Sequence, residues 1–539
     1  MLAVGLICVA TVAWSRFSTL SENFGNYDVA GIVYNADLIL NGGIPYRDTF
    51  EVKTPFLFYL YALVFRIFGA SLIYIRLIWG TWLLVSCALI FGICRRLFDL
   101  DPREQRGVSF YREISAGTAA LLMAVYGTMF DINYASWLVL PLSLSVYSYI
   151  RAKTDHRVFW LLLCGVAASI AFLVKNPGGF IVLLYLGLEA HDAVKIHQRR
   201  ACRRAIWNLV TIAGGCVLGF LPLIAHFGFN SALGPLVRGL FPGWFLKGVL
   251  SAKSTSSEGY LVIQNIPRGL VQIYRMFTLP AVLAVIVIFF MLVWKSFLGY
   301  YGKIAFFWFG LSFFSVLITG GRFYPHHAIL YVPSLVILAV HPGVLVRISD
   351  ASRMRLKKGS RAVLAVGVGA LLIGILTAYK NIWNDERSRY DWPAPIGEPE
   401  PQRLIGEYIK ANTTPEDTII AWGWFAWPIY HWAQRRAPSP IYKETGVLTD
   451  VNTNTEWTLS RPIHFVPGPL SDQYVKDVKA KRPAFVIISQ WFPFISRNEP
   501  LLEFKELLAY LESRYVVLAD MKGFRILRRK DHEVRTSWE

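Results

Sequence analysis

Charged side chains gather in a polar segment near the start of the sequence. Asp28, Arg47, Asp48, Glu51 and Lys53 all fall between residues 15 and 55. A lipid-phosphate substrate needs such a mixture of carboxylates and cations, because its tail stays in the bilayer while its head group meets polar residues at the surface. These five residues are therefore the first candidates for a reactive site.

The segments around these charges have helical apolar spacing. In residues 28–40 the apolar side chains recur three or four positions apart, which is typical of an amphipathic helix. Residues 55–68 show a second such pattern. We expect both helices to lie in the membrane interface and to hold the charges at its edge.

The composition of the whole chain is that of a membrane protein. Of 539 residues, 54% are hydrophobic and 15% are aromatic, and the mean hydropathy is +0.41. A helix needs roughly 20 apolar residues to cross the hydrocarbon core, and about eleven segments qualify. They centre on residues 2–14, 72–93, 114–130, 134–150, 158–173, 177–190, 205–226, 278–294, 304–319, 325–346 and 362–379. The short first segment is interpreted as a retained anchor, since a basic region and a clear cleavage site for a signal peptide are both missing from it.

The basic residues are unevenly divided between the connecting loops, which predicts the orientation. One set of loops holds 21 Lys or Arg in 60 residues: 94–112, 151–157, 195–204, 295–303 and 347–361. The loops at the opposite ends of the spans hold 10 in 109 residues: 15–55, 128–134, 174–177, 227–277 and 320–325. The first set is therefore expected in the cytoplasm. The net charge of +19 belongs to these loops, so a nucleic-acid partner is not indicated.

The remainder of the chain, from residue 380, is nearly neutral and is predicted to lie outside the cytoplasm. Thr418–Trp422, Ala484–Ser489 and Tyr515–Leu518 have strand composition, and Gln402–Lys410 and Pro500–Leu511 have helical spacing. We therefore expect an α-helical polytopic membrane domain over 1–379, with outer loops at 15–71 and 227–277. A linker over 380–401 and a small extracytoplasmic α/β domain over 402–539 complete the predicted organisation.

The first outer loop also carries a family likeness. The matching elements are Tyr27-Asp28, Gly43-x-Pro45-Tyr46-Arg47-Asp48, Lys53-Thr54-Pro55 and Phe68-Gly69, with Arg76, Lys175 and Gly321–His327 further along. In these the sequence resembles the GT-C glycosyltransferases. Within them it looks like the bacterial relatives of dolichyl-phosphate-mannose–protein mannosyltransferases, which include aminoarabinose and lipopolysaccharide galacturonosyltransferases.

The resemblance implies a polyprenyl-phosphate sugar as donor and a lipid, glycan or protein as acceptor. It places the family's acid on Asp28, as a base toward the acceptor, and a second acid on Asp131. Lys53 would face the donor phosphate. The alternatives are a helix-capping role for Asp28, a lysine at position 53 that reaches to the interface, and an ordinary loop carboxylate at 131.

Other charges at the outer edge are candidates for the same donor phosphate. They are Arg76, Lys175, Arg322, His326 and His327, which add to the likeness. Lys175 could instead reach to the membrane interface, and the histidines could be structural. Arg76 within a span is expected to be functional or paired, because an unpaired charge there is costly. Arg47 could hold phosphate or pair with Asp48. Since Val52 separates Glu51 from Lys53, unlike in the aminoarabinose transferases, Glu51 and Asp48 are equal candidates for the adjoining acid.

Several other functional classes lack their signals. No phosphate-binding glycine loop is present, so direct use of ATP or a nucleotide sugar is not indicated. No cofactor is required by any motif, and although several carboxylates could hold a divalent metal, no spacing demands one. A transporter or flippase is the alternative function, with a non-enzymatic assembly protein as a third. The resemblance thus implies a glycosyltransferase, and with the loop charges we expect it in a bacterial inner membrane with its active site facing the periplasm.

Overall fold

The structure is a computed structural model of the chain, and it forms two compact units. One unit comprises Met1–Ser21, Ile73–His226 and Val249–Ser388, and the other Glu22–Leu72, Phe227–Gly248 and Arg389–Glu539. The structure describes residues 2–17, 22–24, 27–100, 109–128, 132–196, 199–241, 266–267, 270–271, 273, 276–293, 299–318, 325–341, 400–444, 447–449, 464–490 and 499–534.

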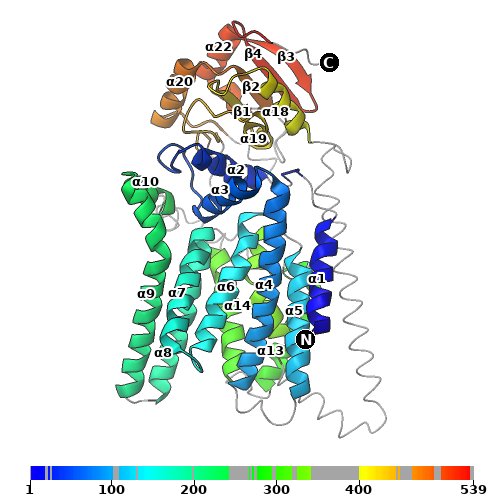
Figure 1. Ribbon diagram of the computed structural model, residues 1–539, viewed down its shortest axis with the longest axis vertical. Coiled ribbons are helices and arrows are strands. Elements are labelled where there is room, and N and C mark those ends of the chain that lie inside the picture. The colour runs from blue at the N-terminus through cyan, green and yellow to red at the C-terminus, as the bar shows by residue number, and fades with distance from the viewer. Residues whose placement is uncertain are drawn as a thin grey trace. The chain divides into compact units, whose positions relative to one another are not determined.

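The first unit is built from apolar helices that run alongside one another (Figure 1). Its α-helices are α1 (Leu2–Phe17), α4 (Leu72–Asp99), α5 (Ser109–Gly127), α6 (Val139–Arg151), α7 (Arg157–Val174), α8 (Ile181–Ile196), α9 (Arg199–Phe229, which ends at the unit boundary), α13 (Thr278–Val293), α14 (Tyr300–Ile318) and α15 (Val332–Ala339). Its short 3-10 helices are η1 (Tyr134–Leu138), η2 (Asn176–Phe180) and η4 (Pro325–Leu330).

These helices confirm the predicted class of a polytopic membrane protein. A helix lies at each predicted span except 362–379, which falls outside the described residues. Within the described residues, α4, α7, α9 and most of α14 are long and apolar enough to cross a membrane. The apolar window of α9 is only 17% buried, as expected of a helix whose side chains face lipid.

Glycines allow α7 and α9 to cross closely. A Cβ added to Gly165 would overlap the Ile212 carbonyl, and one added to Gly215 would overlap the Leu162 carbonyl. Membrane helices associate largely through such backbone contacts, because lipid provides no hydrophobic driving force between them. The two glycines therefore determine how near these helices approach.

The second unit combines the first outer loop with the C-terminal part of the chain. The first loop forms α2 (Tyr27–Leu40) and α3 (Phe56–Phe68), which agree with the two predicted amphipathic helices, and α10 (Leu233–Leu240) belongs to the same unit. The C-terminal part contributes α18 (Pro401–Ala411), η5 (Trp424–Ala426), α19 (Pro428–Ala433), α20 (Pro469–Lys481), α21 (Glu499–Glu503) and α22 (Lys505–Arg514).

A mixed four-stranded sheet forms the centre of this C-terminal part. Its order is β1 (Ile419–Trp422), β2 (Phe485–Ser489), β4 (Phe524–Arg529) and β3 (Tyr515–Met521). β1 is parallel to β2 and pairs Ile419 with Phe485, while β4 is antiparallel to both β2 and β3. The three predicted strands are present. The fourth, β4, was not predicted because Arg525, Arg528 and Arg529 interrupt its apolar alternation.

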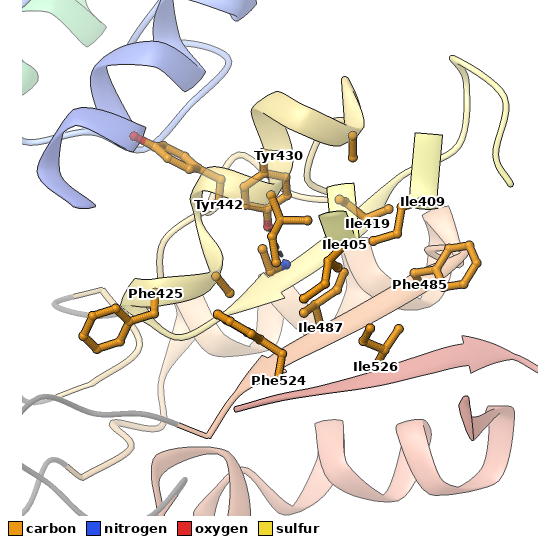
Figure 2. Close-up of a cluster of buried hydrophobic side chains, with 14 of the residues drawn as sticks. Ile405, Ile409, Ile419, Phe425, Tyr430, Tyr442, Phe485, Ile487, Phe524 and Ile526 are labelled. Carbon is orange, nitrogen blue, oxygen red and sulfur yellow. Dashed lines mark hydrogen bonds between the residues drawn. The ribbon is translucent and has the colours of Figure 1, made fainter. Parts of the chain in front are cut away.

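Both faces of the sheet are covered, which explains why β1 and β2 are buried throughout. Ile419 and Phe485 point to one face, toward α18 and α19, and Ile420 and Val486 point to the other, toward α20 and α22. Figure 2 shows the first of these clusters. The predicted helix Pro500–Leu511 is divided into α21 and α22, because Phe504 leaves the helical conformation and packs into the second cluster.

The first-loop helices pack directly on the C-terminal part. The rings of Tyr34 and Tyr442 stack with centroids 4.0 Å apart, and the Phe50 amide donates to the Pro440 carbonyl at 2.8 Å. Tyr442 points away from the sheet, with its hydroxyl beside the blue helix α2 in Figure 2. The first outer loop and the C-terminal part, which lie on opposite sides of the predicted boundary at residue 380, thus belong to one compact unit.

Candidate active site

Asp28 and Lys53 form an ion pair in the first outer loop. Asp28 lies in the first turn of α2, where a negative charge favours the helix. The Lys53 ammonium donates to its carboxylate. The side chains of Lys53 and Asp28 are 27% and 36% exposed, so both are partly open to the surroundings.

The backbone of Lys53 is held from two further directions. The Tyr46 hydroxyl donates to the Lys53 carbonyl at 2.5 Å, and the Lys53 amide donates to Glu51 Oε1 at 3.3 Å. Tyr46 has a φ of 66°, an uncommon value for a residue with a side chain. This conformation lets its ring pack beside Phe58 and Phe227. These contacts therefore fix the backbone that carries the lysine.

Glu51 lies behind this pair and is buried. Its Oε2 accepts from Lys443 Nζ at 2.7 Å and from the Tyr442 hydroxyl at 2.5 Å. Burial by itself would raise the pKa of the Glu51 carboxyl, but the nearby ammonium groups of Lys443 and Lys53 outweigh it and leave that pKa below its ordinary value. Glu51 is thus an ionised internal carboxylate, which distinguishes it from Asp48.

A neutral network continues from Glu51 into α2. The Asn35 side-chain amide donates to the Tyr442 hydroxyl at 3.0 Å and to the Gly31 carbonyl at 2.9 Å. The Asn35 side-chain oxygen accepts from the Thr49 hydroxyl at 2.8 Å. These buried groups therefore satisfy one another and join both ends of the loop to the C-terminal part of the chain.

The Arg47 side chain pairs with Asp48 in the structure. Arg47 Nε lies 2.8 Å from Asp48 Oδ1, and the Ile44 amide donates to the same carboxylate at 2.7 Å. Hydrogen bonding to the Arg47 side chain lowers the pKa of Asp48. Of the two roles considered for Arg47, the structure shows the ion pair.

The other predicted site residues belong to the first unit or lie outside the described residues. Arg76 lies in α4 and is 2% exposed, and Lys175 immediately follows α7. His326 and His327 lie in η4. Asp131 and Arg322 fall outside the described residues. The proposed convergence of these residues with Lys53 joins two separate units and stays a prediction.

Sequence reasoning missed four residues of the site: Tyr46 in its positioning role, Asn35, Tyr442 and Lys443. Tyr46 was part of the family motif, but its contact with the Lys53 carbonyl depends on a positive φ that no pattern indicates. Lys443 is about 390 residues from Glu51 and is preceded by no recognisable motif. Only the packing of the tail against the loop brings them together.

The aromatic side chains between Trp422 and Trp427 could stack on sugar rings, form an interfacial belt, or lie in the seam between the tail and the membrane part. Trp422 is 1% exposed and lies in the core of the C-terminal part, and Trp427 is 3% exposed. Lys443 Nζ lies 5.2 Å from the centre of the Trp427 ring. These two tryptophans are therefore interior residues.

Within the described residues, no group of three or more His, Cys, Asp or Glu is arranged to hold a metal ion.

Comparison with solved structures identifies the fold. ArnT from Cupriavidus metallidurans, bound to undecaprenyl phosphate, is 13% identical and has a TM-score of 0.54, with 97% of each chain covered. The chain has the GT-C fold. The oligosaccharyltransferase AglB from Archaeoglobus fulgidus, in complex with an inhibitory peptide and a dolichol-phosphate, has a TM-score of 0.51. It is 13% identical, and the match covers 90% of this GT-C chain and 69% of AglB.

A sequence match agrees with the GT-C fold. Residues 52–226 match the family model described as dolichyl-phosphate-mannose-protein mannosyltransferase. This segment begins next to Lys53 and continues through α3 to most of α9. Among curated proteins, no sequence matches the chain. The likeness inferred from the first-loop motif agrees with the GT-C fold of these structures and with the family model over residues 52–226.

Proposed function

We propose that this GT-C protein is an integral-membrane glycosyltransferase that moves a sugar from a polyprenyl-phosphate donor to a hydroxyl of a lipid, glycan or protein acceptor. The observation that carries the proposal is the part-exposed Asp28–Lys53 pair, held by α2 and the loop before α3. It provides one acid and one cation within a loop that a lipid head group can approach.

The pair can exchange partners during the reaction. A donor phosphate that approaches Lys53 competes with Asp28 for the ammonium and frees the carboxylate. The oxygen of the acceptor hydroxyl then attacks the anomeric carbon of the donor sugar, and Asp28 accepts the proton of that hydroxyl. The bond from that carbon to the phosphate oxygen breaks, a new glycosidic bond forms, and Lys53 stabilises the negative charge left on the polyprenyl phosphate.

The remaining predicted residues have roles within the same proposal. Arg76, Lys175, Arg322, His326 and His327 would add positive charge around the donor phosphate, and Asp131 would be the second acid. The proposal is supported by the bound molecules named for two proteins of similar fold, undecaprenyl phosphate in ArnT and dolichol-phosphate in AglB. No residue in this scheme requires a metal or cofactor.

The proposed location follows from the charge of the loops. Basic loops at 94–112 and 347–361 are assigned to the cytoplasm. The first outer loop and the tail would then lie on the opposite side, in the periplasm if the membrane is a bacterial inner membrane. A donor whose lipid tail remains in the bilayer can reach the pair from that side.

Purified protein in lipid vesicles, incubated with a panel of polyprenyl-phosphate sugars, tests the proposal. We expect at least one donor to lose its sugar and release polyprenyl phosphate. Lys53→Met should reduce this turnover, because the leaving phosphate loses its cation. Lys505→Met, an exposed lysine of α22 in the tail, is the matched control. The proposal fails if no donor is consumed, or if Lys53→Met and Lys505→Met are equally active.

A further inference from the structure

Lys443 enters the first loop from the C-terminal part of the chain. Its side chain is 9% exposed, although a lysine is rarely buried without a partner. It passes α2 at Gly31, where an added Cβ would overlap the ammonium. Gly31 therefore provides the gap through which Lys443 reaches Glu51.

Two acids and two lysines then alternate in charge from the interior outward. Lys443 and Glu51 form the inner pair, and Lys53 and Asp28 form the outer pair. The inner side chains are 9% and 2% exposed, against 27% and 36% for the outer ones. The inner pair is thus shielded, while the outer pair is accessible.

The backbone connects the two pairs. Glu51 Oε1 accepts the amides of Val52 at 3.0 Å and Lys53 at 3.3 Å, while its Oε2 is engaged by Lys443 and Tyr442. One carboxylate therefore holds the turn that carries Lys53. We therefore expect a displacement of Glu51 to loosen the backbone of the lysine that meets Asp28.

We propose that Lys443 is a positioning residue for the transfer reaction: by pairing with Glu51 it fixes the 51–53 turn and so places Lys53 against Asp28. The inference rests on the proposed function for its catalytic consequence. It makes the C-terminal part a component of the active site and not a separate accessory domain.

The electrostatics of the pair explain why the loss of Lys443 disturbs this turn. A buried carboxylate without its cation is costly, so it takes up a proton or moves toward water. Either response weakens the bonds from the Val52 and Lys53 amides. Burial lowers the pKa of the Lys443 ammonium, and the neighbouring Glu51 carboxylate offsets part of that effect.

A double-mutant cycle on Lys443→Met and Glu51→Gln tests the inference. We expect each single variant to lower kcat by about 10²-fold, the loss typical of a reacting group displaced by about 1 Å, with a smaller change in the donor KM. The double variant should be no worse than the poorer single one, because its two changes remove the same interaction. Gly31→Ala, whose methyl group would occupy the path of Lys443, should reproduce Lys443→Met.

Two measurements without turnover accompany the cycle. Amide hydrogen exchange over residues 50–54 should accelerate in Lys443→Met, and the Tm changes of the two single variants should be non-additive in the double variant. Lys479→Met, which breaks an exposed pair with Glu506, is the control and should alter none of these readouts.

The results separate the inference from the proposed function. An inactive wild type would contradict the function, but exchange at 50–54 and coupling in Tm would still decide whether Lys443 fixes the turn. Unchanged exchange and additive Tm changes would overturn the positioning role. So would a higher donor KM with unchanged kcat in Lys443→Met, because that result indicates direct contact of Lys443 with the donor.

Discussion

At the scale of single residues, the site depends on the different surroundings of its two acids. Asp28 is partly exposed and forms an ion pair with Lys53. Glu51 is buried, and its carboxylate accepts from Lys443, Tyr442 and the loop amides. The sequence could predict Asp28 and Lys53 because both belong to a recognisable motif. It could not rank Glu51 above Asp48, because the cation that distinguishes them comes from a remote part of the chain.

The ionised state of Glu51 predicts a pH dependence of stability. Since the pKa of Glu51 is lower in the folded protein than its ordinary value of 4.5, the folded state favours the charged carboxylate. The resulting stability is present above pH 4.5 and is lost as the pH falls through the lower folded pKa. Thermal unfolding of wild type and Glu51→Gln between pH 3 and 7 measures this contribution of Glu51 to stability. A pKa difference of ~1 unit between the folded and unfolded states corresponds to ~1.4 kcal/mol.

We expect the difference in Tm between wild type and Glu51→Gln to be largest near neutral pH and to shrink in acid. Glu506→Gln, in an exposed pair with Lys479, is the control and should show little difference at any pH. A difference that is constant across the range would mean that Glu51 does not titrate in this way.

At the scale of elements, long apolar segments predicted most helices, because both lipid-facing and core-facing side chains of a membrane helix are apolar. The sequence pattern failed where packing decides the conformation. Phe504 ends α21 by turning into the core, and β4 is stabilised by its pairing with β2 and β3 despite its arginines. Neither feature has a local signal that outweighs the surrounding residues.

The crossing of α7 and α9 gives a test at this scale. Gly215→Ala would force the new methyl group against the Leu162 carbonyl, whereas Gly214→Ala meets only the end of the Leu162 side chain at 3.8 Å. We expect the first change to destabilise the protein by about 1–3 kcal/mol, the usual effect of overpacking. Thermal unfolding in detergent should show a lower Tm for Gly215→Ala and little change or a gain for its neighbour. Equal effects would argue against close backbone contact.

At the scale of the whole molecule, the chemistry is assigned to one side of the membrane. The basic loops predict that Arg355 is cytoplasmic and that the tail is outside. In a variant without its native cysteines, Arg355→Cys should react with an impermeant thiol reagent only after the cells are opened. Ser513→Cys, in the last turns of α22, should react in intact cells once the outer membrane is permeabilised. The reverse labelling would overturn the orientation.

The sequence indicated the kind of protein but not the packing of the first outer loop against the C-terminal part. The first-loop motif by itself indicates the GT-C superfamily, because Asp28, Lys53 and the intervening Pro45-Tyr46 lie close together in the chain. The packing of this loop against the C-terminal part was not predicted, since it rests on contacts such as Tyr34 with Tyr442 between segments about 400 residues apart.

The most direct test of the central claim is sugar transfer by Asp28→Asn, measured beside donor binding. The amide keeps the shape of the carboxylate and still suits the first turn of α2, but it cannot accept the proton of the acceptor. We predict a loss of about 10²–10⁴-fold in turnover, with donor binding retained because Lys53 is freed from its partner. Asp472→Asn, an exposed first-turn acid of α20, should remain fully active. Full activity of Asp28→Asn would contradict the proposed role of Asp28 as the base.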